Sequence, residues 1–171
     1  MKCESCRSPD ADLRCENCDK ALCEDCVLEL EHDAFFYMPK KLEVLSHKQY
    51  CRFCMDDVVE PELQKYNELL DKAKETFVFF TTQKKEIPLI RKTKEKLSVV
   101  ECVDRDETIL RLAFMAAERG MNAVIEVEVS AQKIRNHAHH KHLWQGTGVP
   151  AMVDEAKISH QDRQNMKYER A

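Results

Sequence analysis

Residues 15–26 read CENCDKALCEDC, and this stretch decides the fold of the N-terminal third of the chain. It holds two of four Cys-x-x-Cys pairs, which use eight of the nine cysteines within the first 54 residues. Such a pair lets two thiolates reach one tetrahedral zinc ion, so four pairs supply the ligands of two closed sites. The pairs are Cys3/Cys6, Cys15/Cys18, Cys23/Cys26 and Cys51/Cys54.

The spacing of the pairs predicts which of them share an ion. The gaps between successive pairs are 8, 4 and 24 residues. Four residues are too few for the second and third pairs to form one site comfortably, so we expect an interleaved arrangement. The first site then consists of Cys3, Cys6, Cys23 and Cys26, and the second of Cys15, Cys18, Cys51 and Cys54.

Cysteines in this number can also serve purposes other than zinc binding. Four disulfides in a secreted mini-domain or four redox-active pairs are the alternatives. His32 and His47 are further candidates to replace a cysteine ligand, in a B-box-like arrangement. No apolar stretch approaches the roughly 20 residues of a membrane span, and the N-terminus shows no leader pattern. Free thiolates at this density favour a reducing compartment, so we expect the cytoplasm.

The residues around the pairs resemble a known family of zinc fingers. The stretch 15–26 is followed by YCRFC at residues 50–54, just before an expected helix. This arrangement resembles the FYVE/PHD-type cross-brace fingers over residues 1–58, and it implies a treble-clef finger with two zinc ions per chain. FYVE fingers carry a basic inositol-phosphate motif where this chain has the acidic stretch 19–25. Cys23 stands where a PHD finger has a histidine, which argues against histone-tail binding.

Charge is divided unevenly along the chain. Residues 1–58 carry 13 acidic and 8 basic side chains, whereas residues 59–171 carry 18 and 19. Each four-thiolate zinc site adds about −2 more. A phosphate-binding surface needs the opposite sign. We therefore expect a protein partner for the finger, and neither nucleic acid nor a membrane.

A linker helix is expected over residues 59–75. Pro61 suits the first turn of a helix. Apolar side chains then recur at steps of three and four residues, which indicates a helix with one buried stripe. The stripe consists of Leu63, Tyr66, Leu70, Ala73 and Phe77.

The second half of the chain predicts a small α/β domain over residues 76–155 with a mostly antiparallel sheet, which makes the whole chain α+β. A helix is expected to begin after Asp104, with Glu107 at the capping-box position, and to end before Gly120. The charged segment 84–96 is expected as a solvated loop, and residues 156–171 as a polar tail. Strands are expected at 77–80, 97–103, 123–130 and 143–153.

Two short motifs of this domain resemble a second family. Residues 118–125 read ERGMNAVI and residues 144–150 read WQGTGVP. Both resemble the YbjQ-like heavy-metal-binding-domain family, whose small α/β domains are reported to form rings. The resemblance implies a homo-oligomer built by residues 76–155. Gly146 and Gly148 indicate a bulge or close backbone packing in the last strand.

Four histidines form the remaining cluster with metal-binding chemistry. If the chain is extended there, His137 and His139 share one face, and His140 and His142 share the other. Such pairs can chelate zinc, nickel or copper, and the alternative is an exposed hairpin tip.

No residue pattern predicts catalysis. Glycine-rich phosphate loops and nucleophile elbows are missing from the sequence, and Cys102 reads as a small buried hydrophobe. The leading prediction is a non-enzymatic zinc protein, with the finger as a protein-interaction module on an oligomerising domain. The alternative is a metal-handling protein or enzyme that uses the histidines from His137 to His142.

Overall fold

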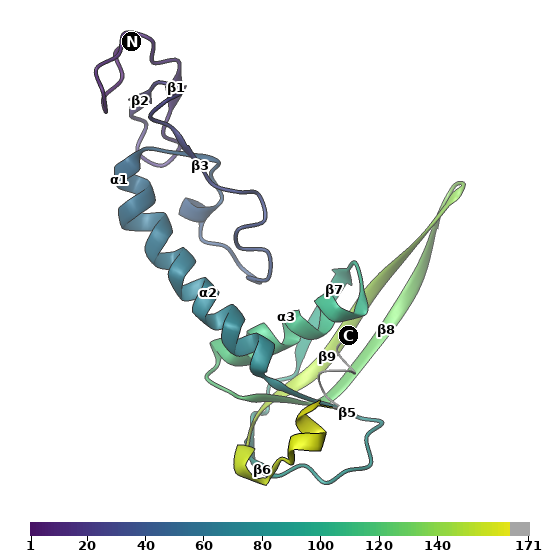
Figure 1. Ribbon diagram of the computed structural model, residues 1–171. Coiled ribbons are helices and arrows are strands. Elements are labelled where there is room, and N and C mark those ends of the chain that lie inside the picture. Colours follow the sequence, from purple (N-terminus) through teal and green to yellow (C-terminus); the bar gives the residue numbers. More distant parts are fainter. Residues whose placement is uncertain (165–171) are drawn as a thin grey trace. The chain divides into compact units, whose positions relative to one another are not determined.

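The computed structural model describes residues 1–164 and divides the chain into two compact units, residues 1–68 and a unit that begins at Leu69 (Figure 1). Both units mix short helices with strands, so the predicted α+β class is confirmed. From residue 165 onward the expected polar tail lies outside the described residues. Within the described residues, no helix is both long and apolar enough to cross a bilayer.

Short antiparallel strand pairs and a small core hold the first unit together. The strands are two residues long, too short for any alternation to show in the sequence. They are β1 (Leu13–Arg14) with β2 (Ala21–Leu22), and β3 (Leu28–Glu29) with β4 (Gln49–Tyr50). A 3₁₀ turn covers Glu43–Leu45. Fully buried side chains of this unit include Leu22, Phe35, Leu45, Tyr50 and Val59.

The helix after the last cysteine pair begins earlier than expected. It starts as α1 (Arg52–Cys54), continues through a π-helical turn (Met55–Val59) and becomes α2 (Glu60–Glu75). Pro61, expected in a first turn, therefore lies inside a continuous helical stretch. Proline cannot donate to the residue four positions earlier and its ring crowds that carbonyl, and the π turn directly before it opens the spacing. Tyr66 and Ala73 of the predicted stripe are buried, but Phe77, its last member, lies beyond the helix in the strand that begins there.

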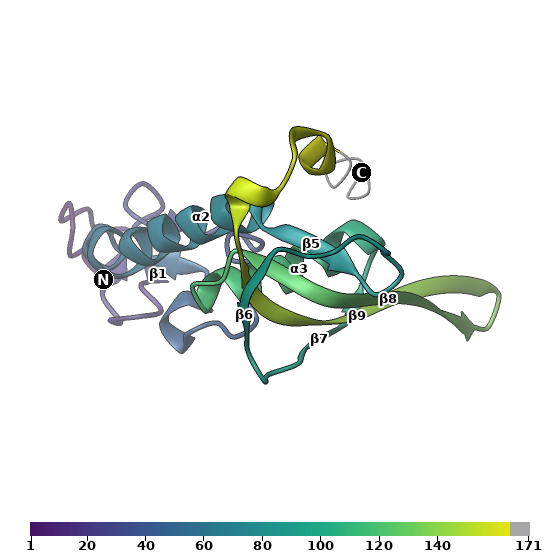
Figure 2. The same ribbon diagram turned by 90° about the horizontal axis from the view of Figure 1, so that it is seen from below.

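A curled five-stranded sheet forms the second unit (Figure 2). Its order is β5-β8-β9-β6, and β7 pairs with the same edge of β9 nearer the hairpin. Only the β5–β8 pair is parallel among the described strands. The strands are β5 (Phe77–Phe80), β6 (Leu89–Lys92), β7 (Leu97–Cys102), β8 (Ala123–Asn136) and β9 (His139–Val153). The segment expected as a solvated loop thus contains an edge strand, β6, whose four residues are all exposed.

Helix α3 (Arg105–Glu118) begins and ends as the sequence predicts. The backbone N–H of Glu107 donates to Asp104 Oδ1 (2.7 Å), and Glu107 Oε2 accepts from the N–H of Val103 (2.7 Å). The second bond reaches the N–H before the N-cap residue rather than that of Asp104 itself, so the two bonds form a variant of the capping box. Gly120 follows the helix with φ = 70°, the left-handed conformation that favours glycine.

Apolar clusters cover both faces of the sheet. On one face, α3 packs through Ile109 and Leu112 on strand residues that include Leu97 and Val124. On the other face the cluster includes Val153 and Ile158, so the expected polar tail contains a buried anchor.

Gly148 lies at a tightly packed point of the sheet. A Cβ there would meet Val124 Cγ1 at 2.5 Å. Opposite Gly148 the register of β8 shifts between Ile125 and Glu128, and Glu126 inside this bulge has φ = 53°. The close backbone packing expected at this glycine is therefore present.

Candidate metal centres

The first predicted quartet comes together in the first unit. The sulfurs of Cys3, Cys6, Cys23 and Cys26 all lie within 4.8 Å of one another. The first knuckle closes where the N–H of Arg7 donates to the carbonyl of Cys3 (2.8 Å), with Arg7 at φ = 67°. The second contributing knuckle closes where the N–H of Val27 donates to the carbonyl of Cys23 (3.1 Å).

The second quartet joins a knuckle to the start of the helix. It consists of Cys15, Cys18, Cys51 and Cys54, again with all sulfurs within 4.8 Å. Cys51 is the N-cap of α1, and its Sγ accepts from the N–H of Cys54 (3.4 Å). The side-chain amide of Asn17 donates to Cys54 Sγ (3.2 Å). Cysteine is not among the residues that usually occupy the N-cap, so the sequence pattern does not mark this helix start.

The geometry of both quartets fits a tetrahedral metal ion. Zinc–sulfur bonds of about 2.3 Å place the sulfurs of a tetrahedron roughly 3.8 Å apart. Cys6 Sγ and Cys23 Sγ are 3.5 Å apart, and Cys18 Sγ and Cys51 Sγ are 3.7 Å apart. All nine cysteines are free thiols. The chain therefore offers two four-sulfur sites that can hold metal ions, in the interleaved pairing that the spacing predicts.

Cys3, Cys23 and Cys26 of the first quartet have pKa values that are shifted in opposite directions. The pKa of Cys3 is lowered to about 6, chiefly because the backbone N–H of Cys6 donates to its sulfur. The pKa of Cys26 is raised to about 12, first by its hydrogen bonds with the sulfurs of Cys6 and Cys23. Burial is the main cause of the raised pKa of Cys23. One thiolate thus makes its neighbours harder to ionise, and a bound cation reverses this effect.

In the second quartet, too, one thiol has a lowered pKa and two have raised pKa values. Burial acts to raise the pKa of Cys15, but backbone hydrogen bonds, first from Cys51, outweigh it and lower that pKa to about 7. Burial raises the pKa of Cys18 to about 12 and also raises that of Cys54. Four sulfur donors of this kind suit soft or borderline cations.

The described histidines lie outside the two cysteine quartets. His32 lies outside both quartets, and so does His47, whose Nδ1 is 3.8 Å from a carboxylate oxygen of Glu16. The four clustered histidines, from His137 to His142, lie at an exposed hairpin tip, with His137 in the turn at φ = 52°. Among the described residues, the groups whose ligand atoms converge are the two cysteine quartets. Cys102 is fully buried, as expected for a small hydrophobe.

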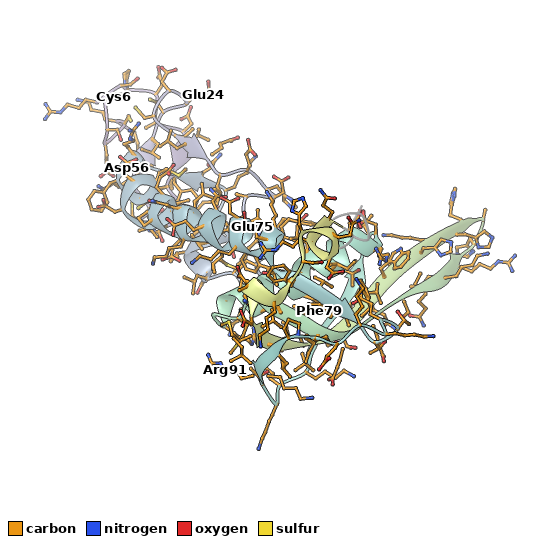
Figure 3. The ribbon with its side chains drawn as sticks, turned by 60° about the horizontal axis from the view of Figure 1, so that its bottom comes forward. Cys6, Glu24, Asp56, Glu75, Phe79 and Arg91 are labelled. Carbon is orange, nitrogen blue, oxygen red and sulfur yellow. The ribbon has the colours of Figure 1, made fainter. Side chains whose placement is uncertain are left out.

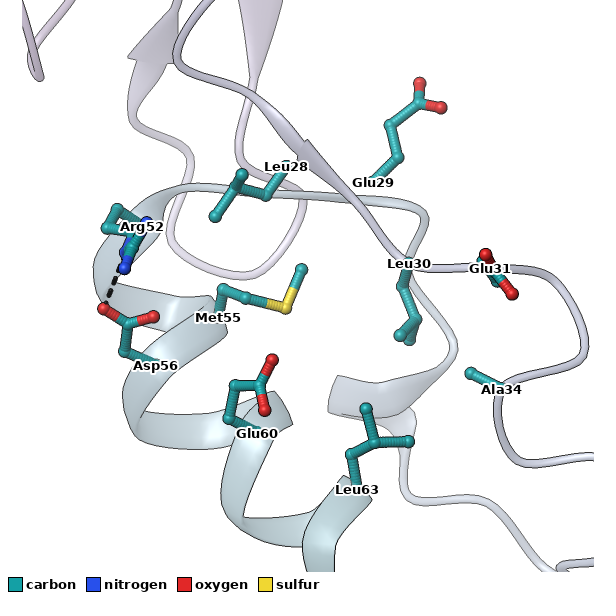
Figure 4. A pocket seen from close by; sticks show the side chains of 10 residues that line it. All are labelled: Leu28, Glu29, Leu30, Glu31, Ala34, Arg52, Met55, Asp56, Glu60 and Leu63. Atoms are coloured by element: carbon teal, nitrogen blue, oxygen red, sulfur yellow. Dashed lines mark hydrogen bonds and ion pairs between the residues drawn. The ribbon is translucent and has the colours of Figure 1, made fainter. Parts of the chain in front are cut away.

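A groove beside the metal centres was not predicted from the sequence (Figure 4). Its volume is about 480 Å³. The floor consists of the half-buried apolar side chains Leu28, Leu30, Ala34, Met55 and Leu63. The rim carries the exposed carboxylates Glu29, Glu31, Asp56 and Glu60, and Arg52 Nε donates to Asp56 Oδ2 at 2.8 Å. The Leu-Glu alternation of residues 28–31 is the sequence signal that marks this groove.

The comparisons with known proteins leave the family open. No family model, curated protein or solved structure matches the chain, so neither the FYVE/PHD-type nor the YbjQ-like resemblance gains support from them.

Proposed function

We propose that this protein is a non-enzymatic zinc protein whose finger binds a basic segment of a protein partner. Zinc is the proposed ion because four-thiolate sites of this spacing are typical of structural zinc. All four ligands of each site come from the chain, which leaves no open coordination position for a substrate. The residues that would hold the ions are the two quartets, and their role would be to fix the finger's fold.

The observation that carries the interaction is the acidic groove. Four carboxylates stand around an apolar floor, and only Arg52 offsets their charge among the lining residues. Charge complementarity then selects a peptide that carries lysine or arginine next to an apolar anchor. Cys54, a ligand of the second metal centre, lies at the start of the continuous helical stretch that supplies Glu60 and Leu63 to the groove. Binding of the peptide would therefore depend on zinc.

A peptide-display screen on the zinc-loaded full chain tests this proposal. We expect enriched peptides to combine basic and apolar residues. The variant Glu31→Gln/Glu60→Gln should weaken their binding about tenfold, on the order of 1.4 kcal/mol. The matched control is Glu24→Gln/Asp25→Asn, which changes the charge equally at exposed finger residues outside the groove.

Either of two results would count against the groove. Enriched peptides without basic residues would remove the electrostatic argument. Equal weakening by the groove variant and by the control would mean that overall charge, and not the groove, attracts the peptides.

The second unit is proposed to form a homo-oligomer. Strand β6 pairs with β9 on one side, and its exposed Ile90 (64%) lies in an edge strand. Val100 (62%) and Val103 (66%) are also large exposed apolar side chains. Open strand edges with apolar side chains favour pairing with a second copy.

Light scattering on the full chain tests this assembly. We expect a mass above that of one 20.0 kDa chain at tens of micromolar, and a monomer for Ile90→Lys/Val100→Lys. A monomeric parent protein would contradict the proposal.

The alternative function, metal handling by the histidines from His137 to His142, stays a prediction. The register of the hairpin places His142 opposite Lys133 and His140 opposite Arg135. Fixed positive charges beside two imidazoles oppose the binding of a cation. The first proposal is therefore the better supported one.

A further inference from the structure

Strands β8 and β9 extend beyond the rest of their sheet as a two-stranded arm (Figures 1 and 2). The pairing of β5 with β8 reaches Val127, and the pairing of β7 with β9 reaches Trp144. From Gln132 to Leu143 the described strands pair only with each other. We define these residues as the arm.

The arm lies in the longest stretch of the sequence without an acidic side chain. Residues 129–153 contain no acidic side chain, although the whole sequence has 31. The arm itself carries Lys133, Arg135 and Lys141, all exposed, and four exposed histidines. The net charge of the chain is −4, so this positive surface is a local feature that the overall balance conceals.

Side chains project from the ribbon along its length (Figure 3). The register assigns the cations to both of its faces. Opposed residues in an antiparallel pair share a face. Lys133 with His142 and Arg135 with His140 therefore form a basic stripe on one face. Lys141 lies opposite Ile134 on the other face.

We propose that the arm binds the phosphate backbone of a nucleic-acid duplex. The major groove of a duplex is about 12 Å wide and admits a two-stranded ribbon, whose strands are about 5 Å apart. A ribbon standing on edge in the groove would have a phosphate strand beside each face, and this arm has fixed cations on each face. The histidines add hydrogen-bond donors to phosphate oxygens.

The tip of the arm disfavours a membrane as the partner. The turn consists of His137 and Ala138, with no large apolar side chain to enter a bilayer. The arm's exposed large apolar residue, Ile134 (41%), lies along the shaft. The sequence-based expectation of no nucleic-acid partner rested on the acidic finger, which is a different surface, and it stays a prediction for that finger.

Fluorescence anisotropy of a labelled 20-base-pair DNA duplex with the full zinc-loaded chain tests the proposal. We expect a dissociation constant on the order of 10 µM at 50 mM salt, rising steeply toward 200 mM. The variant Lys133→Gln/Arg135→Gln/Lys141→Gln removes the fixed charges from exposed positions. It should flatten the log–log salt dependence by about 0.9 for each phosphate that the variant no longer neutralises.

The matched control is Lys84→Gln/Lys94→Gln/Lys96→Gln, which removes three exposed charges from the other basic segment of the same unit. We expect the control to keep the salt slope of the parent protein. The proposal is overturned by absence of binding at 100 µM protein and 50 mM salt, or by an equally flattened slope in the control. Binding to phosphatidylserine vesicles without binding to the duplex would also overturn it.

Discussion

The sulfurs of Cys18 and Cys51 lie 3.7 Å apart, although the two residues are 33 positions apart in the sequence. One belongs to a knuckle near the start of the chain, and the other caps helix α1. The amide of Asn17 strengthens the same link by donating to Cys54 Sγ. A cation between these sulfurs closes a long loop of the chain, so metal binding and folding of the first unit are coupled.

Replacing one sulfur of the second quartet should unfold the part of the finger that the second site holds together. Structural zinc contributes on the order of 10 kcal/mol of apparent binding energy in small fingers. We therefore expect Cys15→Ser to lose one metal ion and to make residues 1–68 sensitive to limited proteolysis. The second unit should stay folded, which the fluorescence of Trp144 on β9 reports because it is the chain's single tryptophan.

Cys102→Ser is the control for this experiment. Cys102 is buried in β7 and far along the chain from both quartets, so both metal ions should remain. Loss of the Trp144 signal in Cys15→Ser would contradict the independence of the two units.

Zinc affinity should rise with pH. Without metal, Cys3 has its pKa lowered to about 6, so its stabilising thiolate is lost only as the pH falls through that value. Cys23 and Cys26 have raised pKa values, with that of Cys26 at about 12, so their protons must leave when zinc binds. Release of two protons corresponds to about a hundredfold gain in affinity per pH unit.

Competition with a chelator at pH 6, 7 and 8 measures this dependence. We expect the protein to lose its metal first at pH 6. An affinity that does not change over this range would mean that the thiols are not the ligands.

The capping box of α3 should contribute to stability. Asp104→Ala removes the acceptor for the Glu107 N–H and should lower the free energy of unfolding of the second unit by about 1 kcal/mol. Asp104→Asn keeps an acceptor and should lower it by only a few tenths of that. Urea titration followed by Trp144 fluorescence separates the two, and equal losses would argue against the cap.

Gly148→Ala should strain the sheet where β9 passes β8. The added methyl group would meet Val124 Cγ1. Because Val124 is buried and β-branched, its side chain cannot easily move aside. We expect a loss of about 1–3 kcal/mol in urea titration. Gln145→Ala, at an exposed position of the same strand, should be nearly neutral.

The double variant Gly148→Ala/Val124→Ala sharpens this test. Removing the obstructing methyl groups should make its loss smaller than the sum of the two single losses. Additive losses would show that Gly148 is needed for another reason.

The metal quartets were predictable because they depend on chemistry and loop length alone. The four residues between Cys18 and Cys23 are too few for the second and third pairs to share an ion comfortably, and that argument needs no tertiary structure. The ends of α3 were predictable for a similar reason, since Asp104 and Gly120 act locally.

Features that depend on exposure were harder to predict. Strand β6 has four exposed residues and no alternation, so nothing in its sequence separates it from a charged loop. The expected strand 123–130 continues to Asn136. The sequence did not predict this extension because the arm is exposed on both faces, which removes the period-two pattern. The groove needs residues from β3 and from the helix, which only the folded chain brings together.

The metal content of the intact chain tests the central claim most directly. Native mass spectrometry of the full-length protein, purified without added chelator, reports the number and mass of bound ions per chain. Two zinc ions per chain, falling to one in Cys15→Ser and staying at two in Cys102→Ser, are the predicted result. One zinc ion or none in the parent protein, with its thiols reduced, would contradict the two-site finger.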